Sequence, residues 1–342
     1  MTNSIDYGFK TTVIGSMPHK DAESACRLLT RHLKDIPAWP QLPWRSSLEG
    51  MGVQFSRGFP GLSLIDGNVA FSRADGFEKS LESLYNAYLA DDYTYFGVTP
   101  EYAAGLHCFL KIAELHTWAV KGQITGPISW CLGIKDEAGK SILYDDILSD
   151  AATRMLALST AWQEKELSKI NKNTIIFVDE PAMSSYGSAF FNLPPEKITG
   201  LINEVLSKIK GVKGIHCCGN TDWGLILSTD VDVLSFDAYN YGSTLSLYPD
   251  AVKNLLGRGG GIAWGIVPNT EAELLSETPA SLKDRLEDSI APFTRTGISF
   301  GQIASRSMLT PSCSLSLLTE EGAEHALVML NSLSNLMKTK YL

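Results

Sequence analysis

The sequence predicts an α/β fold, a (β/α)8 barrel that takes up residues 1–342 as a single catalytic domain. Extended and helical patterns alternate from one end of the chain to the other, which is typical of parallel βαβ units. Residues able to carry chemistry follow the ends of several predicted strands, where barrel enzymes have their active sites. The chain has 342 residues, 44% of them hydrophobic, and is long enough to bury a large core.

Eight apolar segments have the length and composition of buried strands. They are residues 11–15, 38–42, 120–125, 174–178, 214–218, 231–236, 262–266 and 303–308. Between and after them lie segments with the periodicity of amphipathic helices. These are residues 22–33, 77–89, 102–112, 142–170, 196–209, 249–256, 280–290 and 320–337. Eight strands and eight helices in alternation are the content of a closed (β/α)8 barrel.

One insertion is expected after the second strand. Residues 52–55 and 62–65 are both extended in pattern, and Gly58, Pro60 and Gly61 lie between them. This arrangement predicts a hairpin over the mouth of the barrel, which would act either as a lid or as a structural plug.

Charge and cysteine content narrow the class of partner. The formal net charge is −9 and the isoelectric point about 5.2, which argues against binding to nucleic acid or to an anionic membrane. Residues 1–6 have no signal-peptide character, and no apolar run is long enough to span a bilayer. Six scattered cysteines do not form a disulfide framework in a chain of this size. We therefore expect a cytoplasmic protein, a monomer or homodimer, that acts on a small molecule.

The strongest chemical signal is a His-x-Cys pair at the end of the fifth predicted strand. In an extended strand His216 and Cys218 lie on the same face and Cys217 on the other. Cys313 follows the eighth predicted strand, and in a closed barrel the fifth and eighth strand ends face the same mouth. Histidine and cysteine are zinc ligands, and a zinc site that keeps one position open is catalytic.

Four motifs together resemble the C-terminal, zinc-bearing barrel of cobalamin-independent methionine synthase. They are Thr-Val-Ile-Gly-Ser-Met-Pro at 12–18, Asp-Glu-Pro-Ala at 179–182, His-x-Cys at 216–218 and Pro-Ser-Cys at 311–313. Their order is that of the family, and they span most of the chain. The Cys-Gly-Asn at 218–220 also resembles the methylcobamide-dependent thiol methyltransferases. The same superfamily includes uroporphyrinogen decarboxylase.

The resemblance implies a role for each matching residue. His216, Cys218 and Cys313 would bind Zn²⁺, with Asp237 as a further ligand in the place of a family glutamate. Asp179 would be the catalytic-site carboxylate that holds the amino group of homocysteine, whereas its neighbour Glu180 would be structural.

The resemblance also assigns a segment to the substrate carboxylate. The backbone N–H groups of Ile14, Gly15 and Ser16, together with the Ser16 hydroxyl, would donate hydrogen bonds to it.

The expected activity is zinc-dependent methylation of a thiol, with L-homocysteine giving methionine. Full-length cobalamin-independent methionine synthases carry a second, N-terminal barrel that helps to bind folate, and 342 residues leave no room for it. We therefore expect methylcobalamin or a methylated corrinoid on a carrier protein as the donor, in preference to methyltetrahydrofolate. The alternatives are another thiol acceptor such as coenzyme M, a metal-free decarboxylase, zinc-dependent hydrolysis, and a non-catalytic protein with a closed zinc clip or a surface for a corrinoid carrier.

Overall fold

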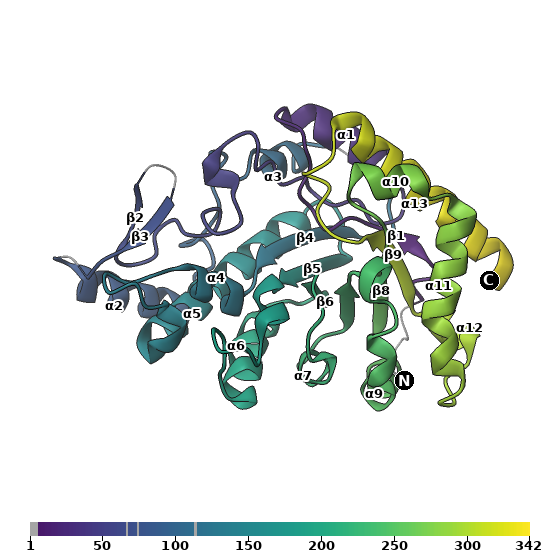
Figure 1. Cartoon of the computed structure of the whole chain (residues 1–342). Coiled ribbons are helices and arrows are strands. Elements are labelled where there is room, and N and C mark those ends of the chain that lie inside the picture. Colours follow the sequence, from purple (N-terminus) through teal and green to yellow (C-terminus); the bar gives the residue numbers. More distant parts are fainter. Residues whose placement is uncertain (1–5, 66–67, 74, 113–114) are drawn as a thin grey trace.

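The computed structural model describes residues 6–65, 68–73, 75–112 and 115–342. Its centre is a curled sheet of seven parallel strands in the order β1-β9-β8-β7-β6-β5-β4, with helices around the outside (Figure 1). The strands are β1 Lys10–Thr11, β4 Val120–Thr125, β5 Thr174–Asp179, β6 Val212–Cys217, β7 Val233–Phe236, β8 Gly261–Val267 and β9 Ser307–Pro311. β1 pairs with β9, so the two ends of the chain meet in one sheet.

Helices occupy all eight segments that the periodicity predicts, shorter helices that were not predicted lie between them, and polar residues cap several of the helices. Asp21, Asp145 and Thr319 each accept a hydrogen bond from a backbone N–H in the first turn of α1, α5 and α13. The α-helices are α1 Ala22–His32, α2 Phe77–Leu89, α3 Ala104–Phe109, α4 Pro127–Gly133, α5 Asp146–Leu167, α6 Pro195–Ser207, α7 Trp223–Leu227, α8 Ala238–Tyr241, α9 Pro249–Gly257, α10 Glu271–Ser276, α11 Pro279–Thr294, α12 Phe300–Ser305 and α13 Glu320–Tyr341. Within the described ranges, none of these helices is both long and apolar enough to cross a membrane.

Several strands of the curled sheet are buried along their whole length. Every residue of β4, β5 and β8 is buried, as expected for parallel strands covered on both faces. Inside the curl, Phe177 packs with a small apolar cluster that includes Ile175, Val233 and Met308. Gly214 on the neighbouring strand makes room for the Phe177 ring, since a Cβ atom at position 214 would lie 2.1 Å from it.

The segment predicted as the second strand is irregular. It is joined to its neighbours only by single parallel bridges, Ala38 with Lys121 on one side and Gln41 with Ser16 on the other. Pro37 and Pro40 explain the difference, because a proline has no N–H to donate to a strand ladder. Over the described residues the curled sheet therefore has seven regular strands where the sequence predicted eight.

Two further predictions of strand limits were wrong. β1 ends at Thr11, so residues 12–15 lie beyond the regular strand. The last strand was expected at 303–308 but begins at Ser307. The residues before it form helix α12, because the Ser299 side chain caps that helix by accepting from the Gln302 N–H at 3.1 Å.

The predicted hairpin also differs from the observed one. Residues 52–55 form turns, with the N–H groups of Val53 and Gln54 both bonded to the Gly50 carbonyl. The two-stranded antiparallel sheet instead joins β2 Leu62–Ile65 to β3 Asn68–Phe71. It lies beside α2 at one edge of the molecule, away from the curled sheet (Figure 1).

Candidate metal and substrate site

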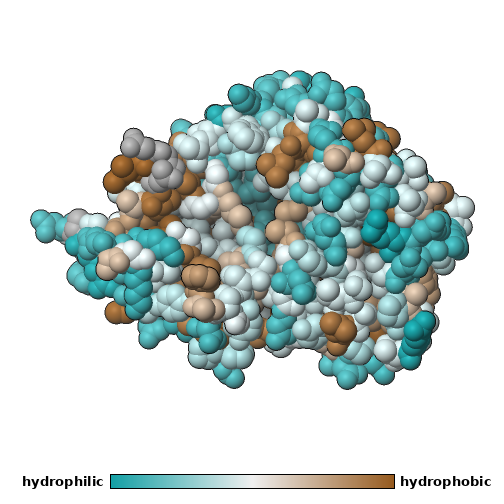
Figure 2. Space-filling view, in the orientation of Figure 1, coloured by the Kyte–Doolittle hydropathy of each residue, from teal (hydrophilic) through white to brown (hydrophobic). Residues whose placement is uncertain are grey.

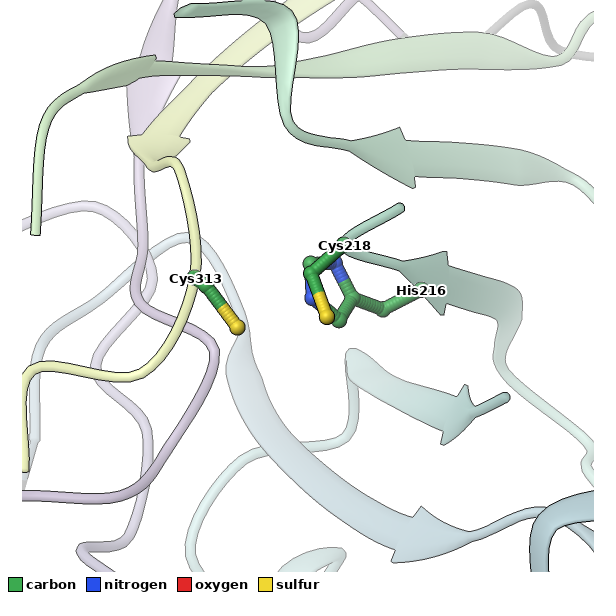
Figure 3. A group of neighbouring side chains, drawn as sticks. All are labelled: His216, Cys218 and Cys313. Atoms are coloured by element: carbon green, nitrogen blue, oxygen red, sulfur yellow. The ribbon is translucent and has the colours of Figure 1, made fainter. Parts of the chain in front are cut away.

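Three of the predicted residues form one cluster. The ligand atoms of His216, Cys218 and Cys313 all lie within 4.8 Å of one another, and their side chains point toward a common centre (Figure 3). His216 is on β6, Cys218 follows its end, and Cys313 lies in the loop after β9. β6 and β9 are three places apart in the sheet, so the curl of the sheet is what brings these residues together.

The imidazole of His216 is held in a definite orientation. The β6–β7 register places His216 opposite Ser235, and Nδ1 lies 3.0 Å from the Ser235 hydroxyl oxygen. Nε2 is buried and has no hydrogen-bond partner among the described residues. A metal ligand needs this arrangement, in which one ring nitrogen is fixed by a neighbour and the other is free.

The two thiols shift each other's pKa in opposite directions. A hydrogen bond from Cys313 lowers the pKa of the Cys218 thiol to about 4, and His216 acts in the same direction. The same hydrogen bond, together with burial, raises the pKa of Cys313. Two cysteines and one histidine with a free Nε2 fit Zn²⁺, which would be bound by both sulfurs as thiolates.

Asp179 lies beside this cluster. It ends β5, and the β5–β6 register pairs it with His216. Its carboxylate is buried, and Oδ1 has no hydrogen-bond partner in the described part of the chain. Burial raises the pKa of Asp179 to about 6, while the nearby His216 and Lys121 oppose this shift. A buried carboxylate oxygen without a donor is suited to receive one from a ligand.

The predicted carboxylate-binding segment reaches the same end of the sheet. The Ser16 carbonyl accepts from the Leu315 N–H at 3.1 Å, which ties the segment to the loop that carries Cys313. Gly15 has φ +149°, a conformation that favours glycine. Over the ranges the structure describes, the backbone N–H groups of Gly15 and Ser16 donate to no protein acceptor. Two adjacent donors are therefore available to an anion.

Asp237 is not a member of the three-residue cluster. Its two carboxylate oxygens accept hydrogen bonds from the Asn240 backbone N–H at 2.9 Å and the Asn240 side-chain amide at 2.8 Å, which caps α8. Burial raises the pKa of Asp237. In this arrangement its carboxylate serves the helix, and its role as a metal ligand stays a prediction.

Glu180 has a structural environment. Its carboxylate accepts from the Ile128 N–H at 2.9 Å, the Ser129 N–H at 2.8 Å and the Ser129 hydroxyl at 2.7 Å. These are contacts with the first turn of α4, and they use both oxygens of Glu180. Burial raises the pKa of Glu180 to about 7.

Three further residues around the site were not identified from the sequence. Ser235 orients His216, while Lys121 and Gln123 extend from β4 into the interior of the curled sheet beneath Ile14 and Gly15. A lysine in the middle of an otherwise buried strand was the signal for Lys121. The partners of Ser235 and Gln123 depend on strand register, which the sequence alone does not show.

Other hollows of the molecule do not contain these residues. A cavity of about 670 Å³ is lined by Thr174 and Val212, which begin β5 and β6, and by Tyr7, which precedes β1, so it lies at the opposite, amino-terminal end of the sheet. On the face seen in Figure 2, hydrophobic residues gather on either side of a central hollow. Some exposed apolar side chains follow the carboxyl ends of strands, among them Phe190 and Leu317.

Comparisons with known proteins give similarity in structure only. No protein-family model and no curated protein sequence matches the chain. A B12-independent methionine synthase from Shewanella sp. W3-18-1, solved in complex with selenomethionine, matches with a TM-score of 0.57 and 14% identity over 97% of this chain and 98% of the other. A putative vitamin-B12 independent methionine synthase from Listeria monocytogenes matches with a TM-score of 0.56 and 16% identity over the same shares. The chain therefore has the fold of these B12-independent methionine synthase structures.

Proposed function

We propose that this protein is a zinc-dependent methyltransferase that converts L-homocysteine to methionine. The observation that carries the proposal is the meeting of three unlike features at one end of the sheet. These are a His-Cys-Cys cluster, a buried carboxylate oxygen without a donor on Asp179, and unused backbone donors at Gly15 and Ser16. Homocysteine carries a thiol, an ammonium and a carboxylate, and so has a group for each feature.

His216, Cys218 and Cys313 would hold the metal. When bound there, Zn²⁺ would supply a Lewis acid that keeps a coordinated substrate thiol deprotonated at neutral pH. The cluster uses three protein side chains, which leaves a position for a substrate sulfur. Asp237, with both oxygens on Asn240, would have to release those hydrogen bonds to become a further ligand.

The protein groups would align the amino acid. Asp179 would accept from the ammonium, and the N–H groups of Gly15 and Ser16 would donate to the carboxylate. With its ammonium and carboxylate held in this way, the substrate would direct its sulfur toward the metal cluster in one orientation. In the reaction the thiol proton would first pass to solvent. A sulfur–carbon bond would then form as the bond between the methyl carbon and its donor breaks, with the electron pair of that bond staying on the donor.

The donor we expected from the sequence was methylcobalamin or a methylated corrinoid, presented free or on a carrier protein. The two solved structures of the same fold are described as B12-independent, and the match covers 97% of this chain and 98% of each of them. They therefore do not support a corrinoid as the methyl donor, and the activity assay below uses methyltetrahydrofolate as well as methylcobalamin.

The proposal includes the architecture predicted for such an enzyme. We infer that the curled sheet closes as a single (β/α)8 barrel, supported by the bridges from Ala38 to Lys121 on β4 and from Gln41 to Ser16 beyond the end of β1. A monomer or homodimer in the cytoplasm stays the expectation.

The test begins with metal content and substrate binding. Zinc-loaded wild-type protein, the Cys313→Ser variant and a Cys131→Ser control are compared by metal analysis and by calorimetric titration with homocysteine. Cys131 is a fully buried cysteine on α4 and lies outside the cluster, so its substitution controls for the loss of a thiol. We expect zinc and homocysteine binding in the wild type and the control, and a loss of both in Cys313→Ser.

Methionine formation is then followed with methylcobalamin and with methyltetrahydrofolate in separate anaerobic assays. Product from either donor supports the proposal and identifies the donor. Wild-type protein that binds zinc but not homocysteine would contradict the proposal and favour the alternative of a non-catalytic, closed zinc clip. Wild-type protein that binds no zinc would favour a metal-free activity such as decarboxylation.

A further inference from the structure

Lys121 is a buried lysine inside the curled sheet that the proposed chemistry does not use. It is the second residue of β4 and is fully inaccessible to solvent. Its Nζ donates to the Ile14 carbonyl oxygen at 2.8 Å and to the Gln123 Oε1 at 3.1 Å. A fully buried lysine is rare and is kept only with satisfied partners.

The surrounding residues hold the Lys121 side chain in one place. Nζ lies 4.5 Å from the centre of the Phe177 ring on β5, within the range of a cation–π contact. That ring occupies the space left by the missing side chain of Gly214 on β6. Three neighbouring strands therefore fix the position from which Lys121 contacts Ile14.

The contact with Ile14 orients the next N–H group. In a trans peptide the carbonyl of one residue and the N–H of the next lie in one plane and point in opposite directions. No peptide bond described in the structure is cis. A hydrogen bond that fixes the Ile14 carbonyl toward Lys121 therefore also fixes the Gly15 N–H on the opposite side, away from Lys121.

Gln123 supports the same segment by packing. A Cβ atom at Gly15 would lie 2.6 Å from the Gln123 side-chain carbon Cδ, so the two residues are in close contact. Gln123 also donates through Nε2 to the Trp39 carbonyl at 3.0 Å. The part of the sheet without a regular strand ladder is thus held from β4 by Lys121 and Gln123.

We propose that Lys121 is the positioning residue for the substrate carboxylate. It acts through the Ile14–Gly15 peptide, which it holds so that the Gly15 N–H faces the bound amino acid. This inference rests on the proposed function, because it assigns the carboxylate of the same substrate to these donors.

The test measures the contribution of the substrate carboxylate to binding affinity separately from that of the thiol and the ammonium. Zinc-loaded wild type and Lys121→Met are titrated calorimetrically with homocysteine and with 3-aminopropane-1-thiol, which keeps the thiol and ammonium but lacks the carboxylate. Methionine has nearly the length of lysine without its donor. Lys213→Met is the matched control, because Lys213 is also a strand lysine but alternates to the outer face of β6, opposite to Gly214 and His216.

We expect Lys121→Met to weaken homocysteine binding by about tenfold or more, as for the loss of a hydrogen bond to a charged group. Binding of 3-aminopropane-1-thiol should change by less than about threefold, so that the ratio of the two affinities falls. Lys213→Met should leave both affinities unchanged. An equal loss for both ligands in Lys121→Met would overturn the inference, since it would mean an effect on Asp179 or on the fold and not one confined to the carboxylate.

A second variant covers the case in which Lys121→Met does not fold, as judged by thermal unfolding. Gln123→Met keeps the lysine and the packing against Gly15 but removes the acceptor at 3.1 Å. It should lower the same affinity ratio in the same direction, and an unchanged ratio would overturn the inference. If wild-type protein binds 3-aminopropane-1-thiol and homocysteine equally well, no carboxylate site exists, and the inference fails while the proposed thiol methylation is not affected. If it binds neither thiol, the proposed function fails as well.

Discussion

Replacement of Ser235 by alanine tests whether the observed cluster is built to bind metal. The Ser235 hydroxyl is 3.0 Å from His216 Nδ1, and both residues are buried. A histidine that binds a metal through Nε2 carries its proton on Nδ1, and in Ser235→Ala this N–H has no acceptor. A buried unsatisfied N–H costs about 1–3 kcal/mol, which corresponds to a loss of about 5- to 150-fold in zinc affinity.

Zinc affinity would be measured by competition with a chromophoric chelator, and folding by thermal unfolding of the metal-free protein. Ser307→Ala is the matched control. Its hydroxyl is also buried and accepts from an aromatic ring N–H, that of Trp264, at 2.9 Å, but it begins β9 and lies away from the cluster. The reasoning is refuted if Ser235→Ala binds zinc as tightly as wild type, or if both variants lose affinity to the same extent.

Three other substitutions have definite expected outcomes. Asp179→Asn should abolish tight homocysteine binding yet raise the melting temperature of the metal-free protein at pH 8. Burial raises the pKa of Asp179 to about 6, so the stability contributed by its protonated form is lost as the pH rises from about 4 through 6. The difference in melting temperature between the variant and the wild type should therefore shrink below pH 6. Equal melting temperatures at pH 8 would contradict this reasoning. Gly15→Ala should lower the free energy of unfolding by about 1–3 kcal/mol and weaken homocysteine binding at full zinc content, because φ at this position is +149° and the new Cβ atom would collide with Gln123. Unchanged homocysteine binding would count against the proposed carboxylate site. Glu180→Ala should lower the free energy of unfolding in urea by about 2 kcal/mol or more, by leaving N–H groups of α4 unpaired, and a parallel loss of zinc affinity would show that its role is not confined to α4.

The sequence was most informative where strands are regular and buried. β4 has the predicted limits, and β5, β6 and β7 agree with the predicted segments within two residues at either end, because continuous apolar runs between helices have few other structures available. The proximity of Cys218 and Cys313, which are 95 positions apart, could also be expected from the predicted strands. Parallel strands in a curled sheet bring their carboxyl ends to one edge.

Prediction failed where local signals competed or where register decides the contacts. The prolines around Trp39 prevent a ladder in a segment whose apolar character indicates a strand. The Ser299 cap turned residues expected in the last strand into α12. Lys121 appears in the sequence as one charged residue in an apolar strand, and only the curl of the sheet shows that it contacts Ile14, more than a hundred residues earlier.

The uneven distribution of backbone hydrogen bonds in the sheet affects which part of the protein opens locally. Regular ladders hold β4 through β9, whereas the segment around Trp39 and the residues that follow β1 depend on single bridges and on side chains from β4. Amide hydrogens in this segment should exchange with solvent sooner than those of β5 or β8, because fewer bonds must break together to expose them. The proposed substrate segment is therefore located where the backbone can loosen without unfolding the rest. Such a local opening would let an amino acid enter and its product leave while the strand ends that carry the metal ligands stay in place.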